Sequence, residues 1–339
     1  MRAAVDVMGG DNAPAAILTG CWEAAPLLNG DDLIYLVGDE AIIKPALSEI
    51  DLPDASRRRY KAIHTTQVVE MDDPPVEAIR NKPDSSISVM CKLAARSEAD
   101  VVISAGNTGA CVAAAQLRMR TLPGVSRPGI AVIIPTFYGP VVLCDVGANI
   151  APKPRHLLQY AIMAGAYSTN VCGVKNPRVG LLSIGEEDAK GTTVVKEARK
   201  LMRDEPQINF VGNVEGRDLF RGIVDVVVCD GFVGNIVLKF TEGLAEGLFQ
   251  TIVAELQESG PELVEQFQPV MKKLYHKHDW QEYGGAPLLG VGGYCLICHG
   301  RSDSRAIKNA IRVGKQLVSS GVNNTIIEEI ALSIPGGED

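Results

Sequence analysis

One pattern recurs along this chain and limits its possible folds more than any other feature. An apolar, β-branched run is followed by a glycine-containing turn with an acidic or amide side chain, and then by a periodic apolar segment. Residues 224–240, VDVVVCDGFVGNIVLKF, show it most clearly: the valines predict a buried strand, Asp230 and Gly231 end it, and a helix follows. The N–H groups that open such a helix can bind an anion, although a single turn of this kind is more often an ordinary helix cap.

Turns of this kind occur in residues 9–14, 38–40, 104–110, 145–149, 185–191, 212–216, 230–235 and 299–303. Alternating strands and helices predict one α/β unit over residues 1–339, a three-layer fold with a largely parallel sheet between helices. Ligands bind at the carboxyl ends of parallel strands. We therefore expect the turns to converge on one edge of the sheet, which favours an enzyme cleft for phosphate or another acid over a scaffold.

Two segments depart from this pattern. Residues 51–85 are rich in proline and charge, and predict an irregular loop apart from a strand near Ala62. Residues 241–283 predict an inserted amphipathic helical hairpin, because apolar residues recur every four positions on both sides of Ser259-Gly260-Pro261. Between positions 240 and 271 the hairpin has six glutamates and no Lys or Arg. Packing on a partner subunit or on the parent domain is therefore favoured over membrane contact.

Composition excludes several classes of function. The chain has 33 Lys and Arg against 41 Asp and Glu, and the net charge of −8 argues against nucleic-acid binding. Neither a signal peptide nor a membrane span is predicted. Eight cysteines are scattered through apolar runs, as expected of reduced core residues in an intracellular protein. Cys295 to His299 match the haem-attachment pattern, but we expect a buried strand there and no metal site.

Known nucleotide and nucleophile motifs are absent. No G-x-G-x-x-G follows the first strand, and no G-x-S-x-G occurs. Residues 185–192 resemble a phosphate-binding P-loop only superficially, because Lys190 precedes Gly191 and three acidic residues stand before it. No nucleotide cofactor and no covalent intermediate are indicated.

Taken together, the motifs resemble one family. They are MGGD with Pro14 (8–14), SAGNTGA (104–110), DVGAN (145–149), IGEEDAKG (184–191), GNVEGRD (212–218), DGFVGN (230–235), GGAPLLGV (284–291) and HGRSD (299–303). Over residues 1–333 the chain is similar to the bacterial phosphate acyltransferase family (acyl-ACP:phosphate acyltransferase, PlsX). The resemblance implies a fold similar to isocitrate and isopropylmalate dehydrogenases and phosphotransacetylases, and a homodimer without metal or nucleotide cofactor.

The resemblance also implies a reaction. A fatty acyl group passes from acyl carrier protein to inorganic phosphate, and the acyl phosphate feeds a membrane glycerol-3-phosphate acyltransferase in phospholipid (phosphatidic acid) synthesis. Such an enzyme must hold phosphate in line with the thioester carbonyl and stabilise the oxyanion. The implied catalytic residues are Lys190, Asn235 and His299. His299 either protonates the departing thiolate or is a strand-end histidine hydrogen-bonded to the backbone.

Further residues are candidates for binding phosphate or the acyl substrate. They are Asp11, Asn107, Thr108, Gly109, Asp145, Asn149, Asp230 and Gly234. Helix N-termini at residues 107–109 and 234–235 suit an anion, with Asn107 and Thr108 as donors. For Asp11, Asp145 and Asp230, the alternative is that they order their turns.

Because acyl carrier protein is acidic, a chain of this net charge needs a local basic surface for it. Residues 57–59, Arg118 with Arg120, and Lys272, Lys273 and Lys277 are the candidates. We expect a cytoplasmic protein with a possible peripheral contact at the inner face of the cell membrane through residues 241–283. The alternatives are a short-chain phosphate transacylase using acyl-CoA, and a non-enzymatic scaffold that recruits acyl carrier protein to the membrane enzyme.

Overall fold

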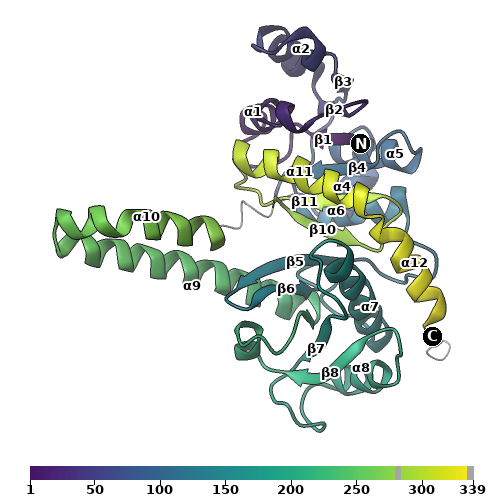
Figure 1. The fold of residues 1–339 in the computed structure, drawn as a ribbon. Helices are drawn as coiled ribbons and strands as arrows, with labels where there is room; N and C mark the ends of the chain where they lie inside the picture. Colours follow the sequence, from purple (N-terminus) through teal and green to yellow (C-terminus); the bar gives the residue numbers. More distant parts are fainter. Residues whose placement is uncertain (279–283, 334–339) are drawn as a thin grey trace.

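The computed structural model describes residues 1–278 and 284–333 (Figure 1). Its strands form one sheet of eleven, ordered β3-β2-β1-β4-β11-β10-β5-β6-β9-β7-β8. The strands are β1 (Arg2–Asp6), β2 (Leu33–Gly38), β3 (Tyr60–His64), β4 (Val101–Ser104), β5 (Gly129–Thr136), β6 (Gly139–Cys144), β7 (Arg178–Leu182), β8 (Asn209–Val214), β9 (Val226–Val228), β10 (Ala286–Leu289) and β11 (Tyr294–Ile297).

The α-helices are interleaved with the strands along the chain. They are α1 (Ala15–Glu23), α2 (Glu40–Glu49), α3 (Asp54–Arg57), α4 (Pro75–Asn81), α5 (Ser86–Ala95), α6 (Thr108–Ala114), α7 (Pro154–Asn170), α8 (Thr193–Arg203), α9 (Gly231–Glu258), α10 (Pro261–His278), α11 (Ser304–Ser320) and α12 (Val322–Leu332). Residues 51–85 were expected to be irregular apart from one strand. They do contain β3, but also α3 and α4, so this expectation was wrong for the two helices.

Helices cover both faces of the sheet, which confirms the three-layer α/β prediction. Strand residues alternate between the faces because successive side chains of a strand point to opposite sides. Ala131 and Ile133 of β5 face the core formed with α1, α7, α8, α11 and α12. Ile130 and Val132 face the second core, which is formed with α4, α5, α6 and the start of α9.

The strands do not all point the same way. Neighbouring strands are parallel from β1 through β4 to β11, and again from β6 to β9. Between these two groups, β10 is antiparallel to both β11 and β5, and β5 is antiparallel to β6. As a result β1, β4 and β11 run opposite to β6, β9, β7 and β8. The expectation that every polar turn converges on one edge was therefore wrong: the two groups of carboxyl ends leave the sheet in opposite directions. They approach each other only over the central strands β10 and β5.

The predicted hairpin is present, with different bounds. It does not begin as an insertion at residue 241, because α9 is continuous from the turn after β9 to Glu258. α9 and α10 lie side by side and project from the body (Figure 1). Phe240, Leu244 and Leu248 remain 69%, 60% and 59% exposed, so the parent domain does not cover them. Residues 279–283 of the predicted segment lie outside the described residues. Of the helices that the structure describes, none has the length and apolar character needed to span a membrane.

Candidate functional site

The turn after β6 is built around the carboxylate of Asp145, which is fully buried. It accepts hydrogen bonds from the backbone N–H groups of Ile130 (2.9 Å), Gly147 (3.2 Å), Ala148 (3.0 Å) and Asn149 (2.7 Å). Burial raises the pKa of Asp145 although these donors act in the opposite sense. The carboxylate is occupied by its own turn, so its structural role is to order residues 145–149.

This turn supports the start of α9. A Cβ on Gly234 would lie 1.9 Å from the carbonyl oxygen of Asp145, so only glycine allows the two segments to approach this closely. Asp230 caps the helix, because its Oδ1 accepts a hydrogen bond from the N–H of Val233 at 2.9 Å. Asp230 and Gly234 therefore set the position and direction of α9.

Asn149 ties the same turn to two other elements. Its Nδ2 donates to the carbonyl of Pro128 (2.7 Å) and to the hydroxyl of Tyr160 (2.6 Å), and its own carbonyl accepts from the N–H of Gly231 (2.8 Å). Both protons of the side-chain amide are thus directed into the protein.

Asn107 is the corresponding anchor at the start of α6. It is 7% exposed, and its Oδ1 accepts from the N–H of Ala110 at 3.0 Å. Its Nδ2 donates to the carbonyls of Glu70 (3.3 Å), Met71 (3.1 Å) and Asp73 (3.0 Å). Asn107 therefore fastens the loop of residues 70–73 to α6. Gly109, two residues later, allows close packing on α4, because a Cβ there would lie 2.6 Å from Cγ of Pro75.

Three of the predicted site residues come together at a cavity of about 190 Å³, which we call the His299 cavity. Thr108 reaches it from the turn after β4, Asn235 from the turn after β9, and His299 from the turn after β11. Its floor is apolar and includes Ile130 and Val132 of β5. Polar groups from oppositely directed strands thus meet over the middle of the sheet, on the face that α6 and α9 cover.

The His299 ring has a defined orientation. Its Nδ1 accepts a hydrogen bond from the N–H of Arg301 at 3.1 Å, and its Nε2 lies 2.9 Å from Nζ of Lys239. Burial lowers the pKa of His299, and the positive charge of Lys239 lowers it further. The ring is therefore neutral at pH 7. It accepts a hydrogen bond from the backbone, as one alternative predicted, and its role towards the departing thiolate stays a prediction.

Lys239 and Ser302 also line this cavity, and neither was predicted from the sequence as a site residue. Lys239 lies one helical turn after Asn235, and its Nζ pairs with Oε2 of Glu242 at 3.0 Å. Ser302 is 1% exposed, and its Oγ has no hydrogen-bond partner within the described residues. The four-residue spacing from Asn235 was a usable signal for Lys239, whereas nothing in the sequence distinguishes Ser302 from a turn serine.

The loop of residues 299–302 is held by the first polar turn of the chain. The backbone N–H of Asp11 donates to the carbonyl of Gly300 at 2.8 Å, and Nδ2 of Asn12 donates to the carbonyl of Arg301 at 3.2 Å. The side chain of Asp11 is exposed, and its charge acts to raise the pKa of His299, against the net lowering. Asp11 therefore lies next to the His299 cavity without lining it.

Lys190 stands apart from this group. Its side chain is exposed in the loop after β7 and lines neither the His299 cavity nor the second cavity described next. The loop is tied to α8, because Asp188 pairs with Arg199 and, at 2.8 Å, with Arg203. The predicted role of Lys190 is not tested by this geometry and stays a prediction.

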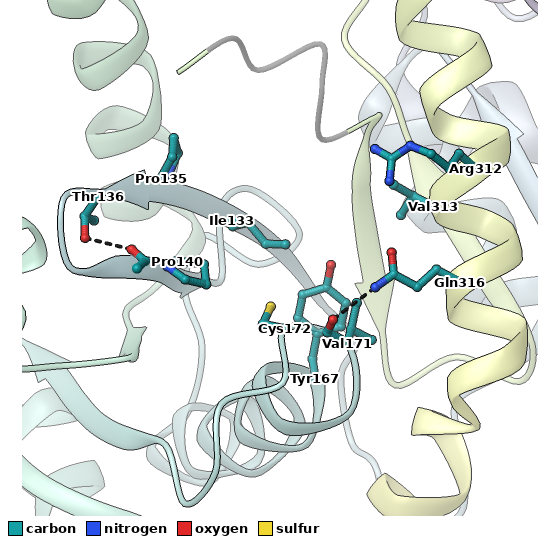
Figure 2. Close-up of a pocket in the computed structure, with 11 residues that line it drawn as sticks. Ile133, Pro135, Thr136, Pro140, Tyr167, Val171, Cys172, Arg312, Val313 and Gln316 are labelled. Carbon is teal, nitrogen blue, oxygen red and sulfur yellow. Dashed lines mark hydrogen bonds between the residues drawn. The ribbon is translucent and has the colours of Figure 1, made fainter. Parts of the chain in front are cut away.

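A second cavity, of about 370 Å³, lies on the other face of β5. Figure 2 shows Arg312, Val313 and Gln316 of α11 facing Tyr167 and Val171 across it. Gln316 is hydrogen-bonded to another residue that lines this cavity, because its Nε2 donates to the carbonyl of Val171 at 3.0 Å. Within the described residues, no group of three or more His, Cys, Asp or Glu side chains could hold a metal ion at either cavity or elsewhere.

Comparison with known proteins gives consistent matches over nearly the whole chain. A family model described as "Fatty acid synthesis protein" matches residues 1–325. A protein of Heliobacterium modesticaldum named phosphate acyltransferase is 46% identical over 341 residues, which covers 99% of this chain and 98% of that protein.

Solved structures agree with the fold. The EutD phosphotransacetylase from Staphylococcus aureus superposes with a TM-score of 0.61 at 15% identity, covering 94% of each chain. A 4-hydroxythreonine-4-phosphate dehydrogenase from Klebsiella pneumoniae gives a TM-score of 0.52 at 14% identity, covering 94% of this chain and 99% of that one. The expected likeness to phosphotransacetylase and dehydrogenase folds is thereby confirmed.

Proposed function

The chain belongs to the phosphate acyltransferase family, and on that premise we propose that it transfers a fatty acyl group from acyl carrier protein to inorganic phosphate. The product is acyl phosphate for phospholipid synthesis. The observation that carries this proposal is the His299 cavity, where Thr108, Asn235 and His299 meet over an apolar floor. A polar end for an anion beside an apolar surface for a hydrocarbon suits both substrates.

The reaction needs positioning more than activation. A phosphate oxygen attacks the thioester carbonyl carbon, the new C–O bond forms, and the C–S bond breaks. The proton of the hydrogen phosphate dianion ends on the departing sulfur, so charge and atoms balance. Asn235 and Thr108 are the proposed donors to phosphate and to the oxyanion. The neutral His299 ring is the proposed hydrogen-bond donor to the departing sulfur, and Lys190 is the proposed cation from the loop after β7.

The remaining candidate site residues act through structure in this proposal. The starts of α6 and α9 are positioned by Asn107, Gly109, Asp145, Asn149, Asp230 and Gly234. The loop of residues 299–302 is positioned by Asp11. Their contribution is preorganisation, because a donor displaced by about 1 Å can lose about 100-fold in rate.

The proposed partners follow from the same premise. Acyl carrier protein docks on one of three basic groups. These are Arg57 to Arg59, Arg118 with Arg120, and Lys272, Lys273 and Lys277 of α10. Arg57 is partly engaged, because it donates to the carbonyls of Ile50 and Leu52. We further propose a homodimer that delivers acyl phosphate to a membrane glycerol-3-phosphate acyltransferase, from a cytoplasmic position or at the inner face of the membrane.

The decisive experiment measures release of free acyl carrier protein from palmitoyl-acyl carrier protein with and without phosphate. Wild type should release it only with phosphate, and palmitoyl-CoA should be a poorer donor. Asn235→Ala and Lys190→Ala should each lower the rate roughly 100-fold, as expected for loss of one transition-state contact. Absence of release with every donor would support the scaffold alternative. Release that survives Lys190→Ala would keep the reaction and remove Lys190 from the site.

A further inference from the structure

Lys239 lines the His299 cavity beside the reacting groups proposed above. It lies on the same face of α9 as Asn235, four residues away, and both line the His299 cavity. Its Nζ is 2.9 Å from Nε2 of His299 and 3.0 Å from Oε2 of Glu242. Its side chain is 48% exposed, so a soluble anion can reach the ammonium group.

The contact between Lys239 and His299 joins two donors. Because Nδ1 accepts from the N–H of Arg301, the single proton of a neutral ring is on Nε2, the atom that faces Nζ. Two donor groups therefore face each other at this point of the cavity. An anion placed beside both atoms accepts a hydrogen bond from each, and the charged donor makes the stronger one.

Ser302 adds a third donor to the same cavity. Its hydroxyl is buried and has no partner in the part of the chain that the structure describes, although buried hydroxyls are normally hydrogen-bonded. Its backbone is fixed, because its N–H donates to the carbonyl of His299 at 2.9 Å and its carbonyl accepts from Nδ2 of Asn12 at 3.3 Å. A rigid loop therefore presents a hydroxyl that a ligand can satisfy.

We propose that Lys239, His299 and Ser302 form the binding site for the inorganic phosphate that attacks the thioester. The proposal rests on the function proposed above and names the anion site of that reaction. Glu242 holds the ammonium group near the cavity when phosphate is absent and releases it when the dianion competes for it. In the reaction, the proton of the hydrogen phosphate dianion ends on the departing sulfur as the C–S bond breaks, and the Nε2–H of His299 stays on the ring and donates a hydrogen bond throughout.

The test separates phosphate binding from other defects. Lys239→Met keeps the length of the side chain and removes its charge, and Ser302→Ala removes one hydroxyl. Each should raise the KM for phosphate, Lys239→Met by ~10- to 100-fold, as expected for a hydrogen bond to a charged group. The KM for palmitoyl-acyl carrier protein should stay within about twofold, and Lys239→Arg should restore part of the phosphate affinity, since it restores the charge.

Lys61→Met is the matched control. Lys61 is exposed on β3, at the far edge of the sheet, so every kinetic constant should be unchanged. Calorimetric titration with inorganic phosphate alone should show weaker binding to Lys239→Met than to Lys61→Met. If wild type shows phosphate-dependent release but both site variants keep the wild-type KM for phosphate, this inference is wrong while the proposed function stands. If wild type shows no release, the proposed function itself fails.

Discussion

At the start of α9 the backbone of Gly234 passes so close to the carbonyl of Asp145 that a Cβ would lie 1.9 Å from the oxygen. We expect Gly234→Ala to force the two segments apart and to lower the free energy of unfolding by roughly 1–3 kcal/mol, the usual cost of overpacking. The rate of phosphate-dependent release should fall by more than the loss of folded protein accounts for, because Asn235 and Lys239 shift with the helix. Urea denaturation and phosphate-dependent release measure the two effects.

Gly243, in the same helix, is the control for this substitution. A Cβ at that position meets no atom within 4 Å. Gly243→Ala should therefore stabilise the protein by about 0.5–1 kcal/mol through helix propensity, and leave the activity unchanged. Equal effects of the two substitutions would show that the contact with Asp145 does not constrain α9.

The individual polar residues of the turns could be identified from the sequence, but their roles could not be predicted from it. Asn107 and Asp145 have the residue types and positions expected of ligand-binding groups, and both are engaged by neighbouring backbone. Whether a side chain bonds inward or outward depends on contacts with distant segments, such as Asn107 with residues 70–73. Ser302 was missed for the same reason, since it becomes notable only beside His299, whereas Lys239 had a local signal in its four-residue spacing from Asn235.

Among the elements, the hairpin of α9 and α10 carries a row of exposed apolar side chains. Leu244 and Leu248 are 60% and 59% exposed, and four residues separate them, so they lie on one face of α9. The proposed homodimer would cover this face. In sedimentation velocity, wild type should then be a dimer and the double variant Leu244→Ser, Leu248→Ser a monomer. Helix content should not change.

The polar face of the same helix offers the control. Glu246 is exposed on α9 and stands two residues from both Leu244 and Leu248, on the opposite side of the helix, so Glu246→Ser should leave the dimer intact. A wild-type monomer, or a double variant that remains dimeric, would contradict pairing through this face. Binding of wild type, but not the double variant, to anionic lipid vesicles would instead assign the face to a membrane, despite the six glutamates between positions 240 and 271.

Most elements could be predicted because their patterns are local. The strand before Asp230, the helix after it and the hairpin all follow from apolar periodicity within about twenty residues. The helices α3 and α4 were missed because proline and charge dominate residues 51–85. For α4 the stabilising contact is with a distant element, because it packs on α6 through Pro75 and Gly109.

In the whole molecule, the direction of the strands decides where the site lies. The sequence indicates an α/β sheet, but β10 comes late in the chain and inserts between β11 and β5 with reversed direction. That pairing is non-local, so no local pattern reveals it. It also explains why Thr108 and His299 approach the cavity from one half of the sheet and Asn235 from the other.

The two halves of the sequence are also joined by charge. Asp32, 5% exposed, pairs with the amino group of Met1 at 2.7 Å and with Lys315 of α11 at 2.8 Å. Burial raises the pKa of the Asp32 carboxyl, but the N–H of Asn29 and these two cations outweigh it and lower the pKa to about 2. The folded protein therefore holds this proton less tightly than the unfolded chain, whose value is near 3.8.

The sign of the effect on stability follows from linkage. A lowered pKa contributes stability above the unfolded value, and the contribution is lost as the pH falls from about 4 towards 2. Asp32→Asn should thus lower the free energy of unfolding by about 2 kcal/mol at pH 7, and the difference from wild type should shrink below about pH 4. Urea denaturation across this range measures it. Asp31→Asn, at the exposed neighbouring carboxylate, should change stability by less than about 0.5 kcal/mol throughout. A deficit in Asp32→Asn that stays constant down to pH 2.5 would mean that packing, and not the charge of Asp32, joins β2 to α11.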